Sequence, residues 1–527
     1  MREITSTTKS KAKTGQANLW VLAATIIGSS MAFIDGTIII VALPIIQTEL
    51  NATVTDVQWI VEAYVLFMAA LMLVGGSMGD RFGRRLIYSI GVILFGIASV
   101  WAGLSQNPAQ LISSRILQGI GAALLIPNSL AILSAYFSER ERGKAIGTWS
   151  GFTAITTALG PVVGGWLVEN ISWRWAFYIN IPFALVVLLI CFWKVPESRD
   201  ENAPSTLDWW GTLLATVGLG GLVYGFIEMS NLGWSDPQVL GTIILGAIAL
   251  VWFVFAEAKS PDPLMPLHLF RSRSFSGANW ITLFLYAASG GFFFFLPFNL
   301  IQVQSYSPTA SGAVFLPMIL VIFVLSRWAG GLVSKYGAKW PLVIGSMITA
   351  GGFALFIPIG IGGSYWLTFF PPMVVLGLGM AISVPPLTTV VMNAVDDRFV
   401  GIASGINNAI SRAAGLLAIA IFGVMALTVF NNNLNDALVL LDVPPVVQQK
   451  LDAERNKLAE AEIPDEADEA LRTELEYAID KAFVASFRWI SMICAVLSLI
   501  SAIVAVLMMS NDRIEVVTEE RQAEVMF

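Results

Sequence analysis

Three ionisable residues interrupt the most apolar parts of the sequence: Asp35, Glu62 and Arg115. Each lies well inside a long stretch that is otherwise rich in Leu, Ile, Val, Ala and Phe. Placing a charge at the centre of a bilayer costs at least a few kcal/mol, so such residues usually mark the path of a proton, an ion or a substrate. We therefore expect these side chains to bind or transfer a proton, an ion or a substrate.

These residues are also predicted to lie at similar depth. At about 1.5 Å per helical residue, they lie about 9 to 14 Å from the outer ends of their helices. Two carboxylates and a guanidinium close together can form a titrating cluster, in which a proton and a cationic substrate compete for the same negative charge. We expect proton coupling by Asp35, Glu62 and Arg115, and substrate binding by the two carboxylates. The alternative is an ion pair that only locks two helices together.

The composition indicates a membrane protein. Hydrophobic residues make up 56% of the 527 residues and charged residues 13%, whereas soluble domains average about 45–50% and about 25%. The two cysteines fall inside predicted spans, and the single histidine has no neighbouring ligand set. Metal binding and nucleophilic catalysis therefore receive little support. We expect no cofactor and no metal.

Runs of roughly 20 apolar residues predict an all-α membrane protein with fourteen transmembrane helices. No cleavable signal peptide is expected, because the first apolar run is too long and lacks a processing site. The predicted spans are 19–44, 57–78, 86–105, 108–135, 145–168, 176–194, 207–229, 239–258, 275–300, 309–333, 341–360, 365–391, 401–429 and 483–510.

The distribution of Lys and Arg predicts the orientation of these spans. If the N-terminus is cytoplasmic, the basic clusters after the even-numbered spans all fall on the cytoplasmic side, and the short outer loops hold only Arg174. This asymmetry satisfies the positive-inside rule. Both termini are therefore expected in the cytoplasm.

One predicted outer loop, 431–482, contains most of the excess negative charge. It holds thirteen Asp or Glu and five Lys or Arg, a net of 5 − 13 = −8, whereas the whole chain is −7. Leu471, Leu475 and Ile479 recur at helical spacing, as do Val447, Leu451 and Leu458 before Pro464, which predicts two amphipathic helices in a hairpin. It either caps the outer mouth as solvated surface or concentrates cations near the opening.

Four segments together resemble signatures of the major facilitator superfamily. The first is the loop after the second span, Gly76-Ser77-Met78-Gly79-Asp80-Arg81-Phe82-Gly83-Arg84-Arg85, which has a weaker copy at Gly330–Gly337. The others are Arg115-Ile116-Leu117-Gln118-Gly119, Gly160-Pro161-Val162-Val163-Gly164-Gly165, and the first-span segment from Ile34 to Pro44. The last segment and the number of spans are similar to the fourteen-span drug:proton antiporters (DHA2).

The resemblance implies two six-helix bundles, spans 1–6 and 9–14, with two extra central helices. The implied domains are a cytoplasmic tail 1–18, an N-terminal bundle 19–198, an insertion and linker 199–274, helices 9–13 at 275–430, the acidic hairpin 431–482, helix 14 at 483–510, and a cytoplasmic tail 511–527. By the same resemblance, Gln118 and Asn407 are expected to join Asp35 and Glu62 in binding substrate.

Two motifs have mechanical interpretations. Asp80, with Arg81, Arg84 and Arg85, is expected to form a cytoplasmic gate by engaging the N-terminal end of span 13; the alternative is a loop that only sets orientation. In the antiporter motif, which is Gly160, Pro161, Gly164 and Gly165, small residues allow close helix approach and Pro permits a kink, which would let the bundles rock. Ordinary helix packing is the alternative.

Some positions depart from the family pattern. Ile40 stands where the branch usually shows Asn, and Ser334 stands where the first copy of the loop has Asp80. No acidic residue lies within spans 9 to 14, so the sequence predicts no proton or cation site in the C-terminal half.

The resulting expectation is a proton-coupled antiporter, not an enzyme, that exports lipophilic, cationic drugs or toxic compounds by alternating access. Its partners are a small-molecule substrate, protons and the lipid bilayer of a bacterial cytoplasmic membrane, with no nucleic acid; a monomer is expected and no periplasmic adaptor is indicated. Export of a lipid, siderophore or other metabolite remains open on the same fold. So does a non-transporting sensor or scaffold, whereas the lack of a His, Cys or metal cluster at the membrane edge argues against a membrane enzyme.

Overall fold

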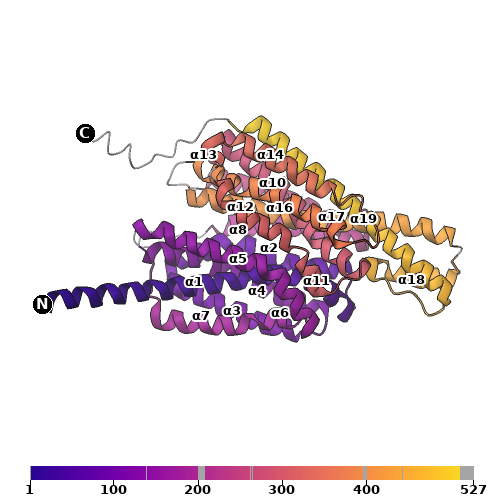
Figure 1. Cartoon of the computed structure of the whole chain (residues 1–527), viewed down its shortest axis with the longest axis horizontal. Coiled ribbons are helices and arrows are strands. Elements are labelled where there is room, and N and C mark those ends of the chain that lie inside the picture. Colours follow the sequence, from indigo (N-terminus) through magenta and orange to yellow (C-terminus); the bar gives the residue numbers. More distant parts are fainter. Residues whose placement is uncertain are drawn as a thin grey trace. The chain divides into compact units, whose positions relative to one another are not determined.

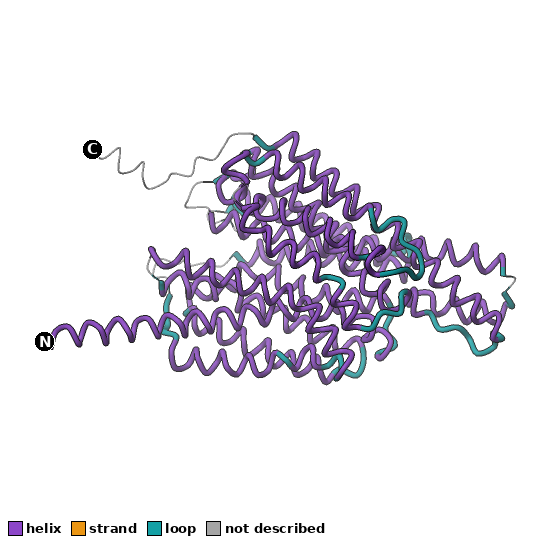
Figure 2. The backbone as a smooth tube through the Cα atoms, in the orientation of Figure 1, coloured by secondary structure: helices purple, strands orange, loops and turns teal. Residues whose placement is uncertain are grey.

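The computed structural model describes residues 2–137, 139–199, 208–260, 263, 265–330, 332–395, 400–441 and 443–510. Across these residues every regular element is helical, and no strand occurs among them (Figures 1 and 2). The predicted all-α class is confirmed. The predicted C-terminal tail, 511–527, lies outside the described residues.

Short connections join most of the helices in chain order. The elements are α1 (Arg2–Glu49), α2 (Val54–Phe82), α3 (Arg84–Leu104), α4 (Pro108–Tyr136), α5 (Glu139–Asn170), α6 (Trp175–Tyr178), α7 (Asn180–Lys194), α8 (Trp209–Leu232), α9 (Pro237–Lys259), η1 (Leu267–Arg271), α10 (Arg273–Phe298), the π-helix η2 (Asn299–Val303), α11 (Pro308–Ala313), α12 (Leu316–Gly330), α13 (Leu332–Tyr336), α14 (Lys339–Ala354), α15 (Tyr365–Thr368), α16 (Phe370–Asn393), α17 (Val400–Leu440), α18 (Pro445–Glu454), η4 (Arg455–Glu460) and α19 (Glu469–Met508).

Among the described residues, 13 stretches are helical, long and apolar enough to cross a membrane. The chain is therefore a multi-pass membrane protein. The predicted span 341–360 is not one of the 13 stretches, because its helix α14 has only 16 residues. Such a helix rises about 24 Å, short of the ~30 Å hydrocarbon core. Turn residues continue the chain from Leu355 to Pro358.

Local sequence explains where several helices begin. Thr53 and Asp56 form a capping box at the start of α2, which satisfies backbone N–H groups that have no partner inside the helix. Asn107 caps α4 ahead of Pro108, a position where the missing N–H of proline costs nothing. Asp208 caps α8 through the N–H of Gly211 at 2.8 Å.

The helices divide into two compact units. The first consists of Met1–Leu264, Leu296–Ala313 and Gly423–Phe483, and the second of Met265–Phe295, Val314–Phe422 and Val484–Phe527. In the first unit α4 packs against α2 and α3, while α1 packs against α5 and α7. The inserted pair α8 and α9 belongs to this unit, because α8 packs on α2. In the second unit α16 packs against α12 and α14.

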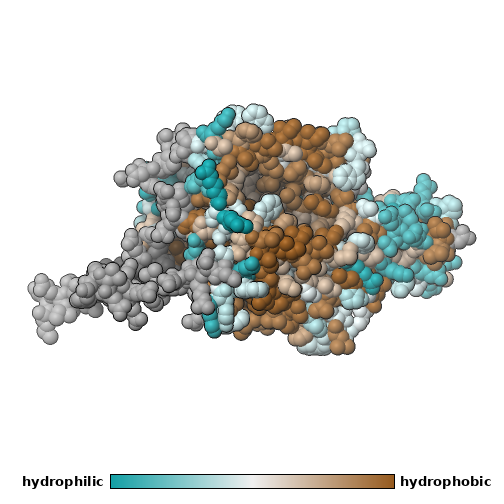
Figure 3. Space-filling view, turned by 90° about the horizontal axis from the view of Figure 1, so that it is seen from above, coloured by the Kyte–Doolittle hydropathy of each residue, from teal (hydrophilic) through white to brown (hydrophobic). Residues whose placement is uncertain are grey.

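The acidic segment 431–482 groups with the first unit. It consists of the ends of α17 and α19 with α18 and η4 between them, and its outer surface is largely hydrophilic (Figure 3). The side chain of Gln47, near the end of α1, donates to the Lys457 carbonyl at 3.1 Å, and the Thr48 hydroxyl donates to Glu460 at 2.9 Å. The hairpin is thus tied to the end of the helix that bears Asp35.

Candidate functional site

Asp35 on α1 lies in the interior of the first unit and is 2% exposed. Its carboxylate forms an ion pair with the guanidinium of Arg115 on α4, which is itself completely buried. Burying two charges is favourable only when their geometry is good and further hydrogen bonds satisfy the remaining polar atoms. The surroundings of this pair therefore matter as much as the pair itself.

Two side-chain amides complete the shell around Asp35. Asn180, the first residue of α7, donates to Asp35 Oδ1 at 2.9 Å, and Gln118 of α4 donates to the same oxygen at 3.1 Å. Both amides also donate to the hydroxyl of Ser99 on α3, at 3.3 and 3.0 Å. Three helices, α1, α4 and α7, thus meet at one carboxylate whose two oxygens both accept hydrogen bonds, and α3 joins them through Ser99.

Arg115 is held as firmly as Asp35. Its Nε donates to the Ile60 carbonyl of α2 at 3.0 Å, and its Nη1 also donates to Gln118 at 2.8 Å. The ring of Tyr64 lies 4.2 Å from the guanidinium carbon, and the ring of Phe177 lies 5.9 Å away. Cations over aromatic faces are stabilised, more so when desolvated. Nη2 has no hydrogen-bond partner among the described residues.

Glu62 on α2 is also completely buried, but it is not part of this network. Neither of its carboxylate oxygens has a hydrogen-bond partner within the described part of the chain. Of the three predicted coupling residues, the structure thus brings Asp35 and Arg115 into contact and leaves Glu62 without a bond to either. An ionised carboxylate buried without a hydrogen-bond partner is very costly.

Sequence reasoning missed Asn180, Ser99 and Tyr64 as members of the site. Asn180 had a usable signal, because an amide at the start of an apolar helix usually has a buried partner. Ser99 had none, since a serine in a membrane helix commonly bonds its own backbone, as Ser99 also does to the Phe95 carbonyl at 2.8 Å. Tyr64 was indistinguishable from ordinary packing.

The end of α2 and the start of α3, joined by Gly83, are tied to the segment that follows α7. Asp80 pairs with Arg84 at 2.7 Å, and the Arg81 guanidinium lies 5.3 Å from the centre of the Phe82 ring. Glu197 accepts hydrogen bonds from the backbone N–H groups of Arg85 and Leu86, at 2.9 and 3.1 Å. This carboxylate caps the start of α3, where the helix dipole favours negative charge.

Gly83 makes this turn possible. Its φ is +120°, and a Cβ at this position would lie 2.8 Å from the Glu197 carboxylate. The predicted gate also involves the start of α17, next to residues 396–399, which lie outside the described residues. That part of the gate remains a prediction.

The glycines of the antiporter motif permit two close approaches on α5. A Cβ at Gly160 would lie 1.9 Å from the Thr37 hydroxyl, and one at Gly164 would lie 2.8 Å from the Ile38 carbonyl, both on α1. On another side, a Cβ at Gly165 would lie 2.2 Å from the Pro308 carbonyl of α11. Pro161 lies inside α5 without ending it. The motif thus sets how closely α5 packs on the helix that carries Asp35.

Asn407 belongs to the second unit. Its amide donates to Asn279 Oδ1 at 3.0 Å and to the Thr282 hydroxyl at 2.7 Å, both on α10. The donor group of Asn407 is thus engaged inside its own unit. Its role in substrate binding remains a prediction.

A shell of apolar helices around a buried ion pair is typical of a polytopic membrane transporter. The sequence matches the model of the Major Facilitator Superfamily over residues 25–419. The chain belongs to this family, whose members are transporters rather than enzymes.

Several curated relatives are resistance or export proteins. The tetracenomycin C resistance and export protein of Streptomyces glaucescens is 34% identical over 409 residues, which cover 77% of this chain and 75% of that protein. The multidrug resistance protein Stp of Mycobacterium tuberculosis is 34% identical, with coverage of 77% and 76%. The methylenomycin A resistance protein of Bacillus subtilis is 33% identical, with coverage of 81% and 90%.

Solved structures of transporters share the fold. An inward-facing, unoccupied bacterial homologue of the human lysosomal transporter Spinster has a TM-score of 0.64 at 19% identity, covering 94% of this chain and 98% of that one. The inward-open xylose transporter XylE from E. coli has a TM-score of 0.54 at 15% identity, with coverage of 97% and 99%. At these identities the likeness concerns the fold alone.

Proposed function

We propose that this protein is a proton-coupled antiporter that exports lipophilic, cationic compounds across a bacterial cytoplasmic membrane. The proposal rests on the buried Asp35–Arg115 pair, a titratable charge that an inert membrane scaffold has no need to bury. The resistance and export proteins among the relatives support the export of antibiotics or other toxic compounds.

In this mechanism Asp35 and Arg115 form the proton-sensitive lock. Protonation neutralises Asp35, weakens its attraction for Arg115 and frees the guanidinium to take another arrangement. A ligand changes the equilibrium between two conformations only if it binds one more tightly than the other. The Asp35–Arg115 pair gives the proton such a difference, because Asp35 binds a proton more readily in a conformation where the pair is broken. Each proton that enters down a potential of 100 mV contributes about 2.3 kcal/mol.

Asp35 is closed to a large ligand in this conformation, because it is 2% exposed and both of its oxygens accept hydrogen bonds. Substrate therefore reaches it only in another state of the cycle. We assign Glu62 the complementary role of a second titratable group. Its buried oxygens have no partner among the described residues, so loss of its proton requires either water or a cation to enter.

The orientation proposed from the basic residues places both termini in the cytoplasm and the hairpin 431–482 outside. Arg174, the one basic residue of the short outer loops, pairs with Glu49 at 3.3 Å near the end of α1. The turn from α2 to α3, with Asp80, Arg81, Arg84 and Arg85, then lies on the cytoplasmic side, where it is proposed to act as the gate.

The decisive experiment is substrate-induced proton release from purified protein, with the lipophilic cation tetraphenylphosphonium as the probe. We expect release from the wild type, none from Asp35→Asn, and reduced release from Glu62→Gln. Asp436→Asn, in the acidic hairpin, serves as the matched carboxylate control. Unchanged release in Asp35→Asn would remove that residue from the coupling role.

A further inference from the structure

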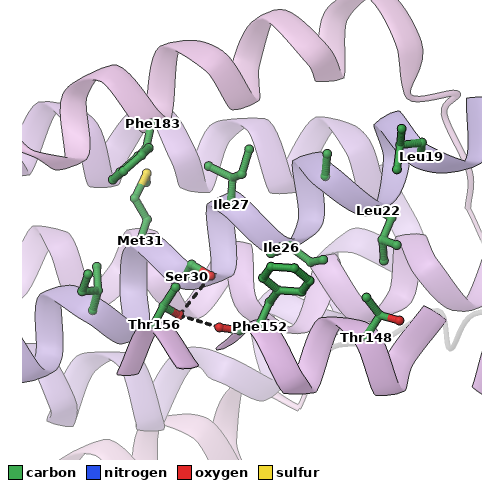
Figure 4. Close-up of a pocket in the computed structure, with 12 residues that line it drawn as sticks. Leu19, Leu22, Ile26, Ile27, Ser30, Met31, Thr148, Phe152, Thr156 and Phe183 are labelled. Carbon is green, nitrogen blue, oxygen red and sulfur yellow. Dashed lines mark hydrogen bonds between the residues drawn. The ribbon is translucent and has the colours of Figure 1, made fainter. Parts of the chain in front are cut away.

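A surface groove lies along the middle of α1, between α5 and α7. Its volume is about 480 Å³, and it extends from Leu19 to Ile34. Figure 4 shows Leu22 and Ile26 along the floor, with Phe152 reaching in from α5 and Phe183 from α7. The groove is therefore lined by three helices of the same unit.

The groove offers no charge to a ligand. None of its 12 lining residues is ionisable, and its polar side chains are the hydroxyl groups of Ser30, Thr148 and Thr156. Thr156 donates to Ser30 at 3.1 Å and to the Phe152 carbonyl at 3.0 Å (Figure 4). The Thr156–Ser30 bond connects α5 to α1, the Thr156–Phe152 bond lies within α5, and together they engage two of the three hydroxyl groups of the groove.

The dimensions of the groove suit an extended hydrocarbon chain. Fifteen helical steps from Leu19 to Ile34 correspond to about 22 Å, more than half of the ~30 Å hydrocarbon core. Its residues come mostly from three membrane-spanning stretches, Leu19–Glu49, Gly151–Asn170 and Trp175–Lys194. Phe152 remains 52% exposed, so the groove is accessible from the surface.

We propose that this groove is a binding site for one acyl chain of a membrane phospholipid. A lipophilic cation is a poorer occupant, because its charge would be desolvated with no carboxylate or aromatic cage against it. A phospholipid inserts only its chain and leaves its charged headgroup at the interface. The chain would contact protein on three sides and exchange more slowly than bulk lipid.

The groove lies next to the residues that hold the ion pair, and its assignment does not depend on the proposed export function. Ile34 precedes Asp35 in the chain, and Phe183 lies one turn from Asn180 on α7. An acyl chain in the groove therefore packs on the helix turns that hold the two residues facing each other at 2.9 Å. Lipid chain length is expected to influence how α1, α5 and α7 pack.

The test is photolabelling of the full-length protein in liposomes with phosphatidylglycerol that has a diazirine on its acyl chain. We expect labelling per residue in 19–34 to exceed that on the exposed surface of α9 at least threefold. Ala23→Phe places a larger side chain in the groove and is expected to lower the labelling of residues 19–34 to the level found on α9. Ala247→Phe is the control, because Ala247 is exposed on α9 and does not line the groove.

Native mass spectrometry supplies a readout that does not depend on the label. Wild type and Ala247→Phe are expected to retain one phospholipid in mild detergent, and Ala23→Phe is expected to lose it. Size-exclusion and melting profiles show whether each variant is folded. If Ala23→Phe does not fold, the wild-type labelling pattern alone tests the proposal. Equal labelling of residues 19–34 and α9 in the wild type overturns the proposal. Displacement of the label by excess tetraphenylphosphonium would assign the groove to a cation and overturn it too.

Discussion

Arg115 on α4 and Asp35 on α1 form an ion pair in which the guanidinium is 0% and the carboxylate side chain 1% exposed. The two residues are 80 positions apart in the sequence. Because the pair is sealed from solvent, loss of either partner leaves the other charge buried without compensation.

The first prediction concerns the stability of this pair. Asp35→Ala is expected to lower the free energy of unfolding by about 3–5 kcal/mol, because it leaves the Arg115 charge buried without a counter-charge. The double variant Asp35→Ala with Arg115→Leu should be less destabilised than the sum of its single changes. Thermal unfolding in detergent of the four proteins of this cycle measures the coupling. Additive losses would mean that the two groups do not interact.

Glu62 should behave in the opposite way. Glu62→Gln is expected to leave the melting temperature unchanged or raise it, since neither carboxylate oxygen has a hydrogen-bond partner in the described residues and a neutral amide is cheaper to bury. Transport should still be impaired, which separates function from folding. A drop in melting temperature as large as that of Asp35→Ala would show that Glu62 has a stabilising partner.

Asn180 provides a test of the shell around Asp35. Asn180→Leu removes the donor to Asp35 Oδ1 at 2.9 Å, and it is expected to cost about 1–3 kcal/mol of stability and to slow proton-coupled transport. Asn170→Leu is the matched control, because Asn170 is exposed and its side chain donates to the Trp166 carbonyl of its own helix at 2.9 Å. Equal effects of the two substitutions would contradict a special role for Asn180.

The antiporter motif predicts a contrast within α5. In Gly164→Ala the new methyl group would lie 2.8 Å from the Ile38 carbonyl, whereas at Gly151 a Cβ meets nothing within 4 Å. Overpacking of this kind costs about 1–3 kcal/mol, so Gly164→Ala should lower the melting temperature and the transport rate. Gly151→Ala should do neither. Tolerance of both changes would argue against close packing of α5 on α1.

The hairpin supplies a prediction about pH. The side chain of Lys450 donates a hydrogen bond to Glu466 and holds the pKa of that carboxyl below its ordinary value of 4.5. The ionised form is thus favoured by folding, so the contact stabilises the hairpin fully above pH 4.5. Its contribution is lost as the pH falls through the lowered pKa.

Hydrogen exchange of residues 445–481 measures this effect. Acidification should speed exchange in the wild type more than in Glu466→Gln, in which the titrating group is absent. The effect is expected to be small, because both side chains of the pair are about half exposed and exposed ion pairs contribute little. An identical acid response in the two proteins would show that other carboxylates control the hairpin.

Much of the fold was predictable from the sequence. Apolar runs of membrane-spanning length stand out against a low charge content, and because burial of a charge in lipid is so costly, Asp35 and Arg115 could be recognised as important without coordinates. Gln118 was predicted through its motif, one turn from Arg115 on the same helix. The short α14 was not predicted, because apolar side chains continue past the residue where the helix ends.

Only the tertiary structure decided which groups meet. Asn180 of α7 and Tyr64 of α2 contact the ion pair, and Ser99 of α3 accepts hydrogen bonds from the two amides beside it. Which side of a helix faces its neighbours is set by packing of helices far apart in the chain. Glu62, predicted at a similar depth, makes no bond to the pair, because depth along a helix does not determine direction around it. The groove likewise depends on how α5 and α7 diverge over α1. Hydrogen bonds and cavities need atoms placed to within a few tenths of an ångström, which a pattern of residue types does not specify.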